Sequence, residues 1–254
     1  MAIVFRSATT ASINNSQSVT VSRPTGLTQD DVLVATLMVD GTDVDTPAGW
    51  TKVNQTAGTY ELATFIKVAG ASEPTSYAFT AVSGSGDFAV ALAAYVGVDT
   101  VDPIMAQASS DSGLSSTAGT APAVTAGDET LVITAWGIGQ SSGTYQAVAD
   151  ATTNQRAATS VAGLVSVGVT LADFVSPAGN TGSKTASTAS KVFWATQTLA
   201  LRVGNAPPSA PTLLGPADGA TLDRNMTQRF SWQFNDPNPG DTQSAYEIRY
   251  RRTV

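Results

Sequence analysis

The sequence DDVLVATLM at residues 30–38 indicates the fold class, because a second copy of it occurs later in the chain. It aligns without gaps with DETLVITAW at residues 128–136, and two acidic residues lead each run. Taken alone, Thr28 and Asp31 imitate a capping box at the start of a helix. The second copy is rich in Val, Ile and Thr, which favour strands. The two copies together predict a β-strand at both positions.

The repeat continues along the chain in the same order. FAVALAAYVGV at residues 88–98 has an apolar residue at every second position, and FWATQTLALRV at residues 193–203 repeats that spacing. LATFIKV at residues 62–68 corresponds in the same way to LVSVGVTL at residues 164–171. Such alternation between clusters of Gly, Asn, Asp, Ser and Pro is typical of many short strands. The sequence therefore predicts an all-β protein with two weakly similar runs of strands.

Two architectures fit a repeat of this length: one large double-sheet sandwich with similar halves, or two tandem immunoglobulin-like domains. No Pro/Gly-rich linker separates the copies, and the long polar stretch at residues 98–116 is typical of a crossover or surface loop. We favour one antiparallel sandwich of jelly-roll or lectin-like type over residues 1–203. In its last strand, Trp194, Thr196 and Thr198 lie between the apolar positions, so we expect that face to be solvated or only partly covered.

A second unit follows a proline-rich linker. GNAPPSAP at residues 204–211 has three prolines in eight residues and predicts an extended spacer. Residues 212–254 are typical of a partial fibronectin type III-like module, with a third strand at residues 244–252 and with Trp232 and Tyr246 as core residues on facing strands. A complete module needs about seven strands. We therefore expect either a longer chain or completion by partner subunits through β-augmentation.

Composition excludes several classes of function. The chain has 13 basic and 20 acidic residues, a net charge of -7, no histidine and no cysteine. Disulfides, the usual zinc ligand sets and His-dependent catalytic triads are therefore excluded, and scattered basic residues argue against nucleic-acid binding. No secretory signal is recognisable at the start, and no apolar run approaches the roughly 20 residues of a membrane helix. We expect a protein that is not an enzyme, has no cofactor and does not insert into membranes.

Three aspartates form the principal candidate metal site. VDGTDVDTPAGW places Asp40, Asp43 and Asp45 close together, and carboxylate oxygens are ligands that Ca²⁺ prefers. The spacing does not match an EF-hand, so an acidic loop between strands is the alternative. SGSGDFA at residues 83–89 has the G-x-G-x-x-A spacing of a dinucleotide site. The strand-like residues that follow favour a Gly-rich hairpin turn instead.

Three aromatic residues near expected loops are candidate glycan contacts. Trp50, Tyr60 and Tyr145 could each stack on a sugar ring. For Trp50, which follows PAG, a plug that closes one end of the sandwich is the alternative.

Two stretches resemble proteins of tailed bacteriophages. MAIVFRSATTASINNSQSVTVSRPTGLTQDDVLVATL at residues 1–37, followed by TPAGWTKV at residues 46–53, resembles the start of minor tail and tail-fibre proteins, especially of phages that infect actinobacteria. FSWQFNDPNPGDTQSAYEIRYR at residues 230–251 is similar to the opening of fibronectin-like modules in phage structural proteins and bacterial surface enzymes.

The resemblance implies a structural protein of the virion, made in the host cytoplasm and released by lysis. It implies a minor tail or tail-fibre role in assembly or host-surface adhesion, with other virion proteins and a host-surface glycan as partners and with a homotrimer by analogy. Two alternatives stay open: a capsid decoration protein with a projecting fibronectin-like domain, and a carbohydrate-binding module of a bacterial surface protein.

Overall fold

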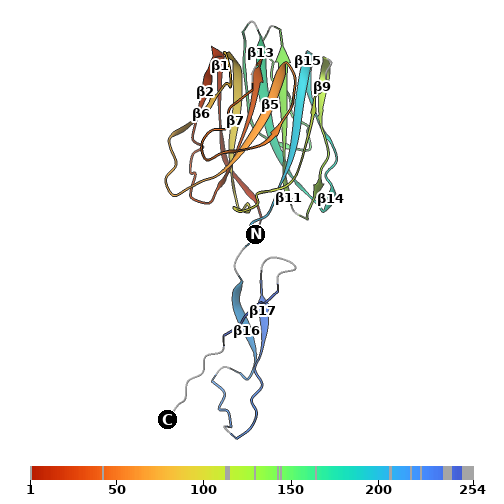
Figure 1. Cartoon of the computed structure of the whole chain (residues 1–254). Coiled ribbons are helices and arrows are strands. Elements are labelled where there is room, and N and C mark those ends of the chain that lie inside the picture. Colours follow the sequence, from red (N-terminus) through yellow and green to blue (C-terminus); the bar gives the residue numbers. More distant parts are fainter. Residues whose placement is uncertain are drawn as a thin grey trace. The chain divides into compact units, whose positions relative to one another are not determined.

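The computed structural model confirms the predicted all-β, antiparallel fold class (Figure 1). It describes residues 2–41, 43–111, 115–128, 130–141, 143, 145–163, 165–205, 208–217, 219–223, 225–236 and 242–247. The chain divides into two compact units, the sandwich unit Ala2–Gly204 and the C-terminal unit Asn205–Val254. Within the described part of the chain, no helix has the length and apolar composition needed to cross a lipid bilayer.

The first half of the sandwich unit forms one large sheet and one outer strand pair. The sheet has the strand order β1-β7-β3-β5-β4, and β2 pairs separately with β6. The strands are β1 (Val4–Ser16), β2 (Ser18–Ser22), β3 (Val32–Asp40), β4 (Thr51–Gln55), β5 (Tyr60–Val68), β6 (Ser76–Thr80) and β7 (Gly86–Val96).

The second half repeats this arrangement. Its sheet has the order β8-β15-β11-β13-β12, and β9 pairs with the first part of β15. The strands are β8 (Ile104–Asp111), β9 (Ser116–Ala121), β10 (Thr125–Ala126), β11 (Thr130–Gln140), β12 (Asn154–Val161), β13 (Ser166–Ser176), β14 (Gly179–Asn180) and β15 (Lys184–Leu201). The small β10–β14 pair is an addition to this half.

The sequence repeat is thus a repeat of topology. Strands β3 and β11 carry the DDVLVATLM and DETLVITAW copies, and each lies at the centre of its sheet. The neighbours also correspond, because β7 and β15 lie on one side of these strands and β5 and β13 on the other.

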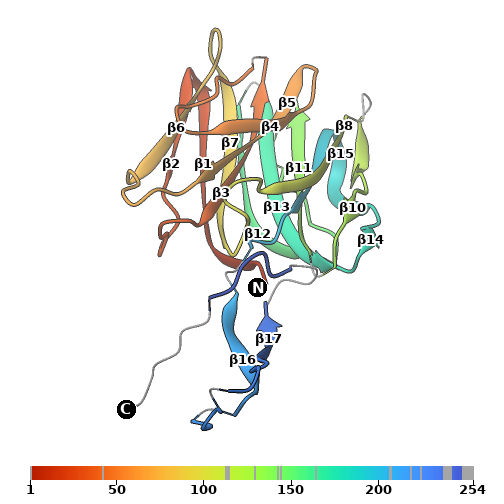
Figure 2. The same ribbon diagram turned by 60° about the horizontal axis from the view of Figure 1, so that its bottom comes forward.

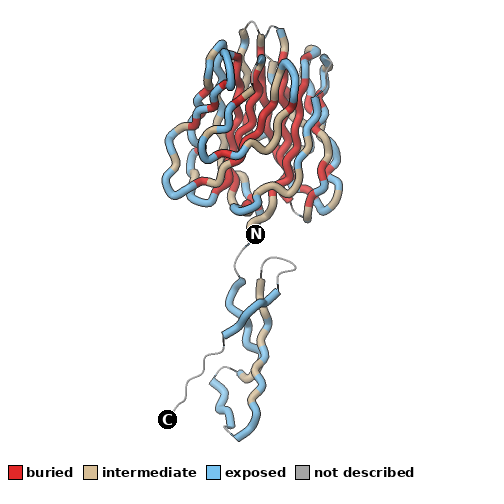
Figure 3. The backbone as a smooth tube through the Cα atoms, in the orientation of Figure 1, coloured by how far each residue is buried: buried red, intermediate tan, exposed pale blue. Residues whose placement is uncertain are grey.

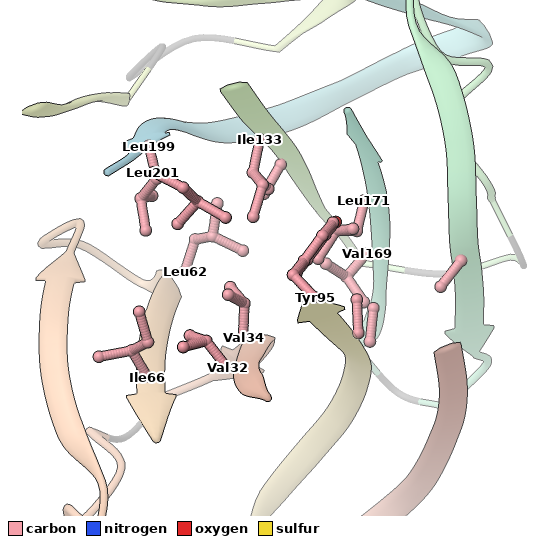
Figure 4. Close-up of a cluster of buried hydrophobic side chains, with 14 of the residues drawn as sticks. Val32, Val34, Leu62, Ile66, Tyr95, Ile133, Val169, Leu171, Leu199 and Leu201 are labelled. Atoms are coloured by element: carbon pink, nitrogen blue, oxygen red, sulfur yellow. The ribbon is translucent and has the colours of Figure 1, made fainter. Parts of the chain in front are cut away.

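The two large sheets pack face to face around one apolar core (Figure 4). The labelled side chains come from both halves: Val32, Val34, Leu62, Ile66 and Tyr95 from the first, and Ile133, Val169, Leu171, Leu199 and Leu201 from the second. Each fully buried aliphatic side chain stabilises the fold by about 1.5–3 kcal/mol. Because one cluster includes residues of both halves, residues 2–204 form a single sandwich rather than two separate domains.

The central strands are buried on both faces (Figure 3). In β3, Val32 and Val34 point into the central core, whereas Leu33 and Leu37 pack beneath the outer β2–β6 pair. Figure 2 shows this pair on one side of the sandwich and the β10–β14 pair on the other. Burial on both faces explains why VLVATLM is a nearly continuous apolar run.

The predicted solvated face of β15 is wrong. Trp194, Thr196 and Thr198 are buried, because β9 and the first part of β15 cover that side of the sheet. The indole Nε1 of Trp194 donates to the Ser116 carbonyl at 2.9 Å, and Thr196 Oγ1 donates to the Thr120 carbonyl at 3.0 Å.

Two predicted loops also differ from the structure. Residues 98–116 contain the edge strand β8, which pairs with the last part of β15. The SGSGDFA stretch connects β6 in the outer pair with β7 in the large sheet, so it crosses between layers and is not a hairpin turn. No helix begins after its glycines, because β7 starts at Gly86, which removes the dinucleotide interpretation.

The C-terminal unit contains one antiparallel pair in its described residues, β16 (Ser209–Gly215) and β17 (Ser231–Asn235). The rings of Trp232 and Tyr246 are in contact, with centroids 4.9 Å apart, but Tyr246 is 68% exposed and is not a core residue. Of the predicted third strand, residues 244–247 are not in a strand, and residues 248–252 lie outside the described residues.

Candidate functional site

The sandwich unit has two ends, which are distinguished by the strands that start and finish there. Strand β1 starts and β15 finishes at the same end, where Val4 pairs with Val96 and Val98 forms a bridge with Val203. At the other end, which we call the distal end, β3 and β11 finish and β5, β7 and β13 start. The predicted site residues Asp40, Tyr60 and Tyr145 lie at or near the distal end.

An aromatic pair joins the two halves at the distal end. Tyr60 at the start of β5 packs against Phe193 of β15, with ring centroids 5.5 Å apart. The Tyr60 ring lies directly on Gly139 of β11, where a Cβ atom would overlap it. Phe193 is 39% exposed. Sequence reasoning placed Phe193 on the core face and missed this position, because the alternation does not show where the sheet ends.

Two carboxylates lie close together beside Tyr60, and one of them, Asp40, acts on the tyrosine directly. Asp40 is the cross-strand partner of Tyr60, and its Oδ1 accepts a hydrogen bond from the Asp87 amide. Asp87 Oδ1 accepts one from the Asn15 amide at 2.7 Å. Burial and the nearby Asp40 charge raise the pKa of Asp87, and the same two causes raise the pKa of Tyr60. The main chain therefore positions the acidic groups.

A second polar network extends from Lys52 of β4. Its Nζ lies 2.8 Å from Asp43 Oδ1 and 2.8 Å from Gln55 Oε1. Gln55 Nε2 in turn donates to Glu61 Oε2 at 2.9 Å. Burial and the Asp43 charge raise the pKa of Glu61, against the opposing effect of Gln55 and Lys52. These side chains neutralise one another rather than leaving an open acidic cleft.

The predicted calcium ligands do not form a metal-binding group. Asp43 forms an ion pair with Lys52, and its Oδ1 also accepts a hydrogen bond from the Val44 amide at 2.6 Å. Asp45 is exposed, and its amide donates to the Thr80 carbonyl at 2.9 Å. Among the described residues, no group of three or more Asp or Glu side chains could hold a metal ion. Asp40, Asp43 and Asp45 are therefore best described as an acidic segment that begins at the last residue of β3.

Trp50 is a core residue. It is 7% exposed and packs edge-on against Tyr77 and Phe79, with centroids 5.3 Å away in each case. This is the plug that its position after PAG suggested, and its burial removes Trp50 from the candidate glycan contacts.

Tyr145 lies over a narrow pocket on the outer side of the second sheet. The pocket is lined by Gln140, Ser166 and Val192 among others. Ser166 Oγ and Gln140 Oε1 are buried and have no hydrogen-bond partner among the described residues. Tyr145 itself is half-buried. Of the three predicted glycan contacts, Tyr60 and Tyr145 thus keep accessible surface near the distal end.

The protein is thus an all-β sandwich with duplicated halves, with the Tyr60–Phe193 pair and Asp40 at its distal end. A scan against protein-family models, a search of curated proteins and a search of solved structures each returned no match.

Proposed function

We propose that this protein is a non-enzymatic structural protein of a bacteriophage particle, in a minor tail or tail-fibre role. The observation that carries the proposal is the separation of the two ends of the sandwich unit. Its chain enters and leaves at one end, where the Gly204 amide donates to the Gly97 carbonyl at 2.8 Å. The Tyr60–Phe193 pair and Asp40 lie at the other end, so the unit is suited to be held at one end and to present the other.

The distal end has the chemistry of a glycan contact. Aromatic rings stack on the apolar faces of sugars, and carboxylates accept hydrogen bonds from sugar hydroxyls. Phe193 and Tyr60 supply the rings, and Asp40 supplies an acidic neighbour. The resemblance to phage tail proteins in residues 1–37 and 46–53 points to a host-surface glycan as the ligand.

A carbohydrate-binding module of a bacterial surface protein is the second candidate. The Tyr60–Phe193 pair supports this function as well as it supports the first, because a glycan ligand fits both. The presence or absence of this chain in purified phage particles distinguishes the two functions.

The test is quantitative mass spectrometry of purified phage particles from the bacterium whose genome, or whose phage, encodes this chain. A few copies per particle, counted against the major capsid protein, is the expected result. Hundreds of copies would indicate a capsid decoration protein, and absence from particles would overturn the virion proposal in favour of the carbohydrate-binding module.

A further inference from the structure

We propose that the narrow pocket beneath Tyr145 is a subsite for the acetamido group of an N-acetylated sugar, and that the Tyr145 ring turns aside to admit it. Ser166 and Gln140 both line the pocket. Ser166 Oγ and Gln140 Oε1 are buried and have no hydrogen-bond partner among the described residues. The inference rests on the glycan-binding part of the proposed function and adds the chemical class of the sugar.

Strand pairing places these two side chains on the same face of the second sheet. Gln140 is the last residue of β11, Ser166 is the first residue of β13, and the two are cross-strand partners. The Cβ atoms of residues directly opposite each other in an antiparallel pair are about 4.5–5.5 Å apart. The register therefore brings an amide oxygen and a hydroxyl to one small site at the distal end, and the two groups do not bond to each other.

The pocket is closed while the Tyr145 ring lies over it. In this form it has no room for a water molecule, so water does not satisfy the two polar atoms. Nearly all buried polar groups in native proteins have a hydrogen-bond partner, and leaving one unpaired costs free energy. A ligand that supplies both partners recovers this cost when it enters.

The Tyr145 side chain can move while the sheet stays in place. It is half-buried, and within the described part of the chain it makes no hydrogen bond and no contact with another aromatic ring. The main chain beyond it is anchored, because Thr170 Oγ1 donates to the Ala147 carbonyl at 3.0 Å and the Val148 amide donates to the Ser187 carbonyl at 2.9 Å. Rotation of the side chain alone opens the pocket, and such rotamer changes are common on binding.

The acetamido group matches the lining of the pocket. It has one N–H donor, one carbonyl acceptor and one methyl group. Gln140 Oε1 accepts from the N–H, and the Ser166 hydroxyl donates to the carbonyl. Ile138 and Val192 are buried residues of the lining and supply apolar surface for the methyl group. A sugar hydroxyl in the same place has no methyl group to fill the apolar part.

The pocket adjoins the Tyr60–Phe193 pair at the same rim of the sheet. Gly139 belongs to the pocket lining and carries the Tyr60 ring, and Val192 of the lining directly precedes Phe193 in β15. Successive side chains of a strand point to opposite faces, so the pocket and the aromatic pair lie on opposite faces of one rim. A sugar chain that crosses the rim reaches both, which favours a sugar over a peptide as the source of the amide.

The first experiment is isothermal titration calorimetry of the full chain with two trisaccharides. N,N′,N″-triacetylchitotriose carries the acetamido groups, and cellotriose has hydroxyls in their place. We expect the wild type to bind the acetylated trimer at least about tenfold more tightly, because cellotriose leaves the buried polar atoms unpaired. Ser166→Ala should remove most of this preference, Phe193→Ala should weaken both trimers alike, and Val101→Ala should change neither affinity.

The outcomes separate this inference from the proposed function. Equal affinities for the two trimers would overturn the acetamido subsite and leave glycan binding standing. Failure to bind either trimer would overturn the subsite, while the virion role is still decided by the composition of purified particles.

A second experiment tests the unpaired hydroxyl without any sugar. Ser166→Ala removes a buried hydroxyl that has no partner, so we expect the variant to be at least as stable as the wild type in urea. Thr170→Val is the matched control, because it removes a buried hydroxyl that donates to the Ala147 carbonyl, and it should lower stability. A Ser166→Ala variant that is clearly less stable than the wild type would show that the hydroxyl has a structural role and would overturn the proposal.

Discussion

The side-chain amide of Gln197 donates a hydrogen bond to the carbonyl oxygen of Leu62 across the central core, at 2.6 Å. Gln197 is on β15 in the second half and is fully buried, and Leu62 is on β5 in the first half. Gln197 Oε1 also accepts a hydrogen bond from Thr64, whose hydroxyl lies 3.2 Å from that of Thr36. Apart from this polar bridge, the two halves meet chiefly through apolar side chains.

Replacing Gln197 should destabilise the sandwich unit. Gln197→Leu removes both hydrogen bonds and leaves the Thr64 hydroxyl with only its contact to Thr36. We expect the free energy of unfolding to fall by about 2 kcal/mol, measured by urea denaturation of the full chain and followed by tryptophan fluorescence.

A double mutant shows whether the bridge itself is responsible. With Thr64→Val in place, the buried hydroxyl is absent and Gln197→Leu should cost clearly less than it does alone. Additive effects of the two substitutions would mean that the bridge contributes nothing as a pair.

The ion pair between Arg156 of β12 and Asp173 of β13 should also contribute to the stability of the sandwich unit. Arg156 Nε lies 2.8 Å from Asp173 Oδ2, the Asp173 side chain is 0% exposed, and the guanidinium lies 4.3 Å from the centroid of the Phe5 ring. Arg156→Met should lower the free energy of unfolding by about 3 kcal/mol, because it leaves a buried carboxylate without its cation. The double mutant Arg156→Met, Asp173→Asn should regain much of this loss in the same assay, and a double mutant as unstable as Arg156→Met would contradict the explanation.

The pH dependence of stability should distinguish two glutamates. Burial and the Asp43 charge raise the pKa of Glu61 in the folded chain. The wild type therefore loses stability as the pH rises from the pKa of Glu61 in the unfolded chain, about 4.3, through its higher pKa in the folded chain. Glu61→Gln should therefore stabilise the protein at pH 7 by less than about 1 kcal/mol, since the group is half-exposed. Below the unfolded pKa this gain should vanish.

Glu73→Gln provides the opposite case. Burial opposes ionisation of Glu73, but hydrogen bonds from the Gly70 amide, Tyr77 and Lys67 outweigh it and lower the pKa. Its contribution is present above the unfolded pKa and is lost as pH falls through the folded one. Glu73→Gln should destabilise the protein at pH 7 and have little effect in acid. Equal signs for the two variants at pH 7 would show that the carboxylate environments are misassigned.

Gly119 should tolerate no side chain. It lies against the Trp194 indole, where an added Cβ would overlap the ring, so Gly119→Ala should displace the outer layer and cost about 2 kcal/mol in thermal or urea unfolding. Gly70→Ala is the control, because Gly70 is exposed and its Cβ would meet only Glu73 Oε1 at 3.6 Å. Similar effects of both substitutions would contradict a specific role of the Trp194 contact.

The distal aromatic pair should govern binding to host cells. We expect Phe193→Ala and Tyr60→Ala each to weaken binding of the full chain to the host surface about tenfold, corresponding to about 1.4 kcal/mol of lost stacking. Val101→Ala, at the opposite end of the sandwich unit, should leave binding unchanged. Flow cytometry with a fluorescent label measures this, and wild-type affinity in both aromatic variants would remove the distal pair from the glycan site.

Much of the fold could be predicted from the sequence, and the candidate site only partly. The copies at residues 30–38 and 128–136 predicted the strands and their duplication, because a strand buried in the same way needs the same apolar run. The covered face of β15 was not predictable from its polar residues, since Thr196 and Thr198 are buried and Thr196 donates to a carbonyl of β9, a strand distant in sequence.

The same limit applies to the site. Proximity to a predicted loop could not separate Trp50, which is in the core, from Tyr60, which lies at the distal end. Phe193 escaped notice because its exposure depends on where the sheet ends. Contacts between side chains of the two halves depend on tertiary packing, and local sequence patterns do not predict them.

The most direct test of the proposed function is immunogold labelling of purified phage particles with antibodies raised against residues 2–204. A few gold grains confined to the tail or its tip are the result that a minor tail or tail-fibre protein predicts. Dense labelling of the head would contradict the tail assignment, and particles without label would contradict any role in the virion.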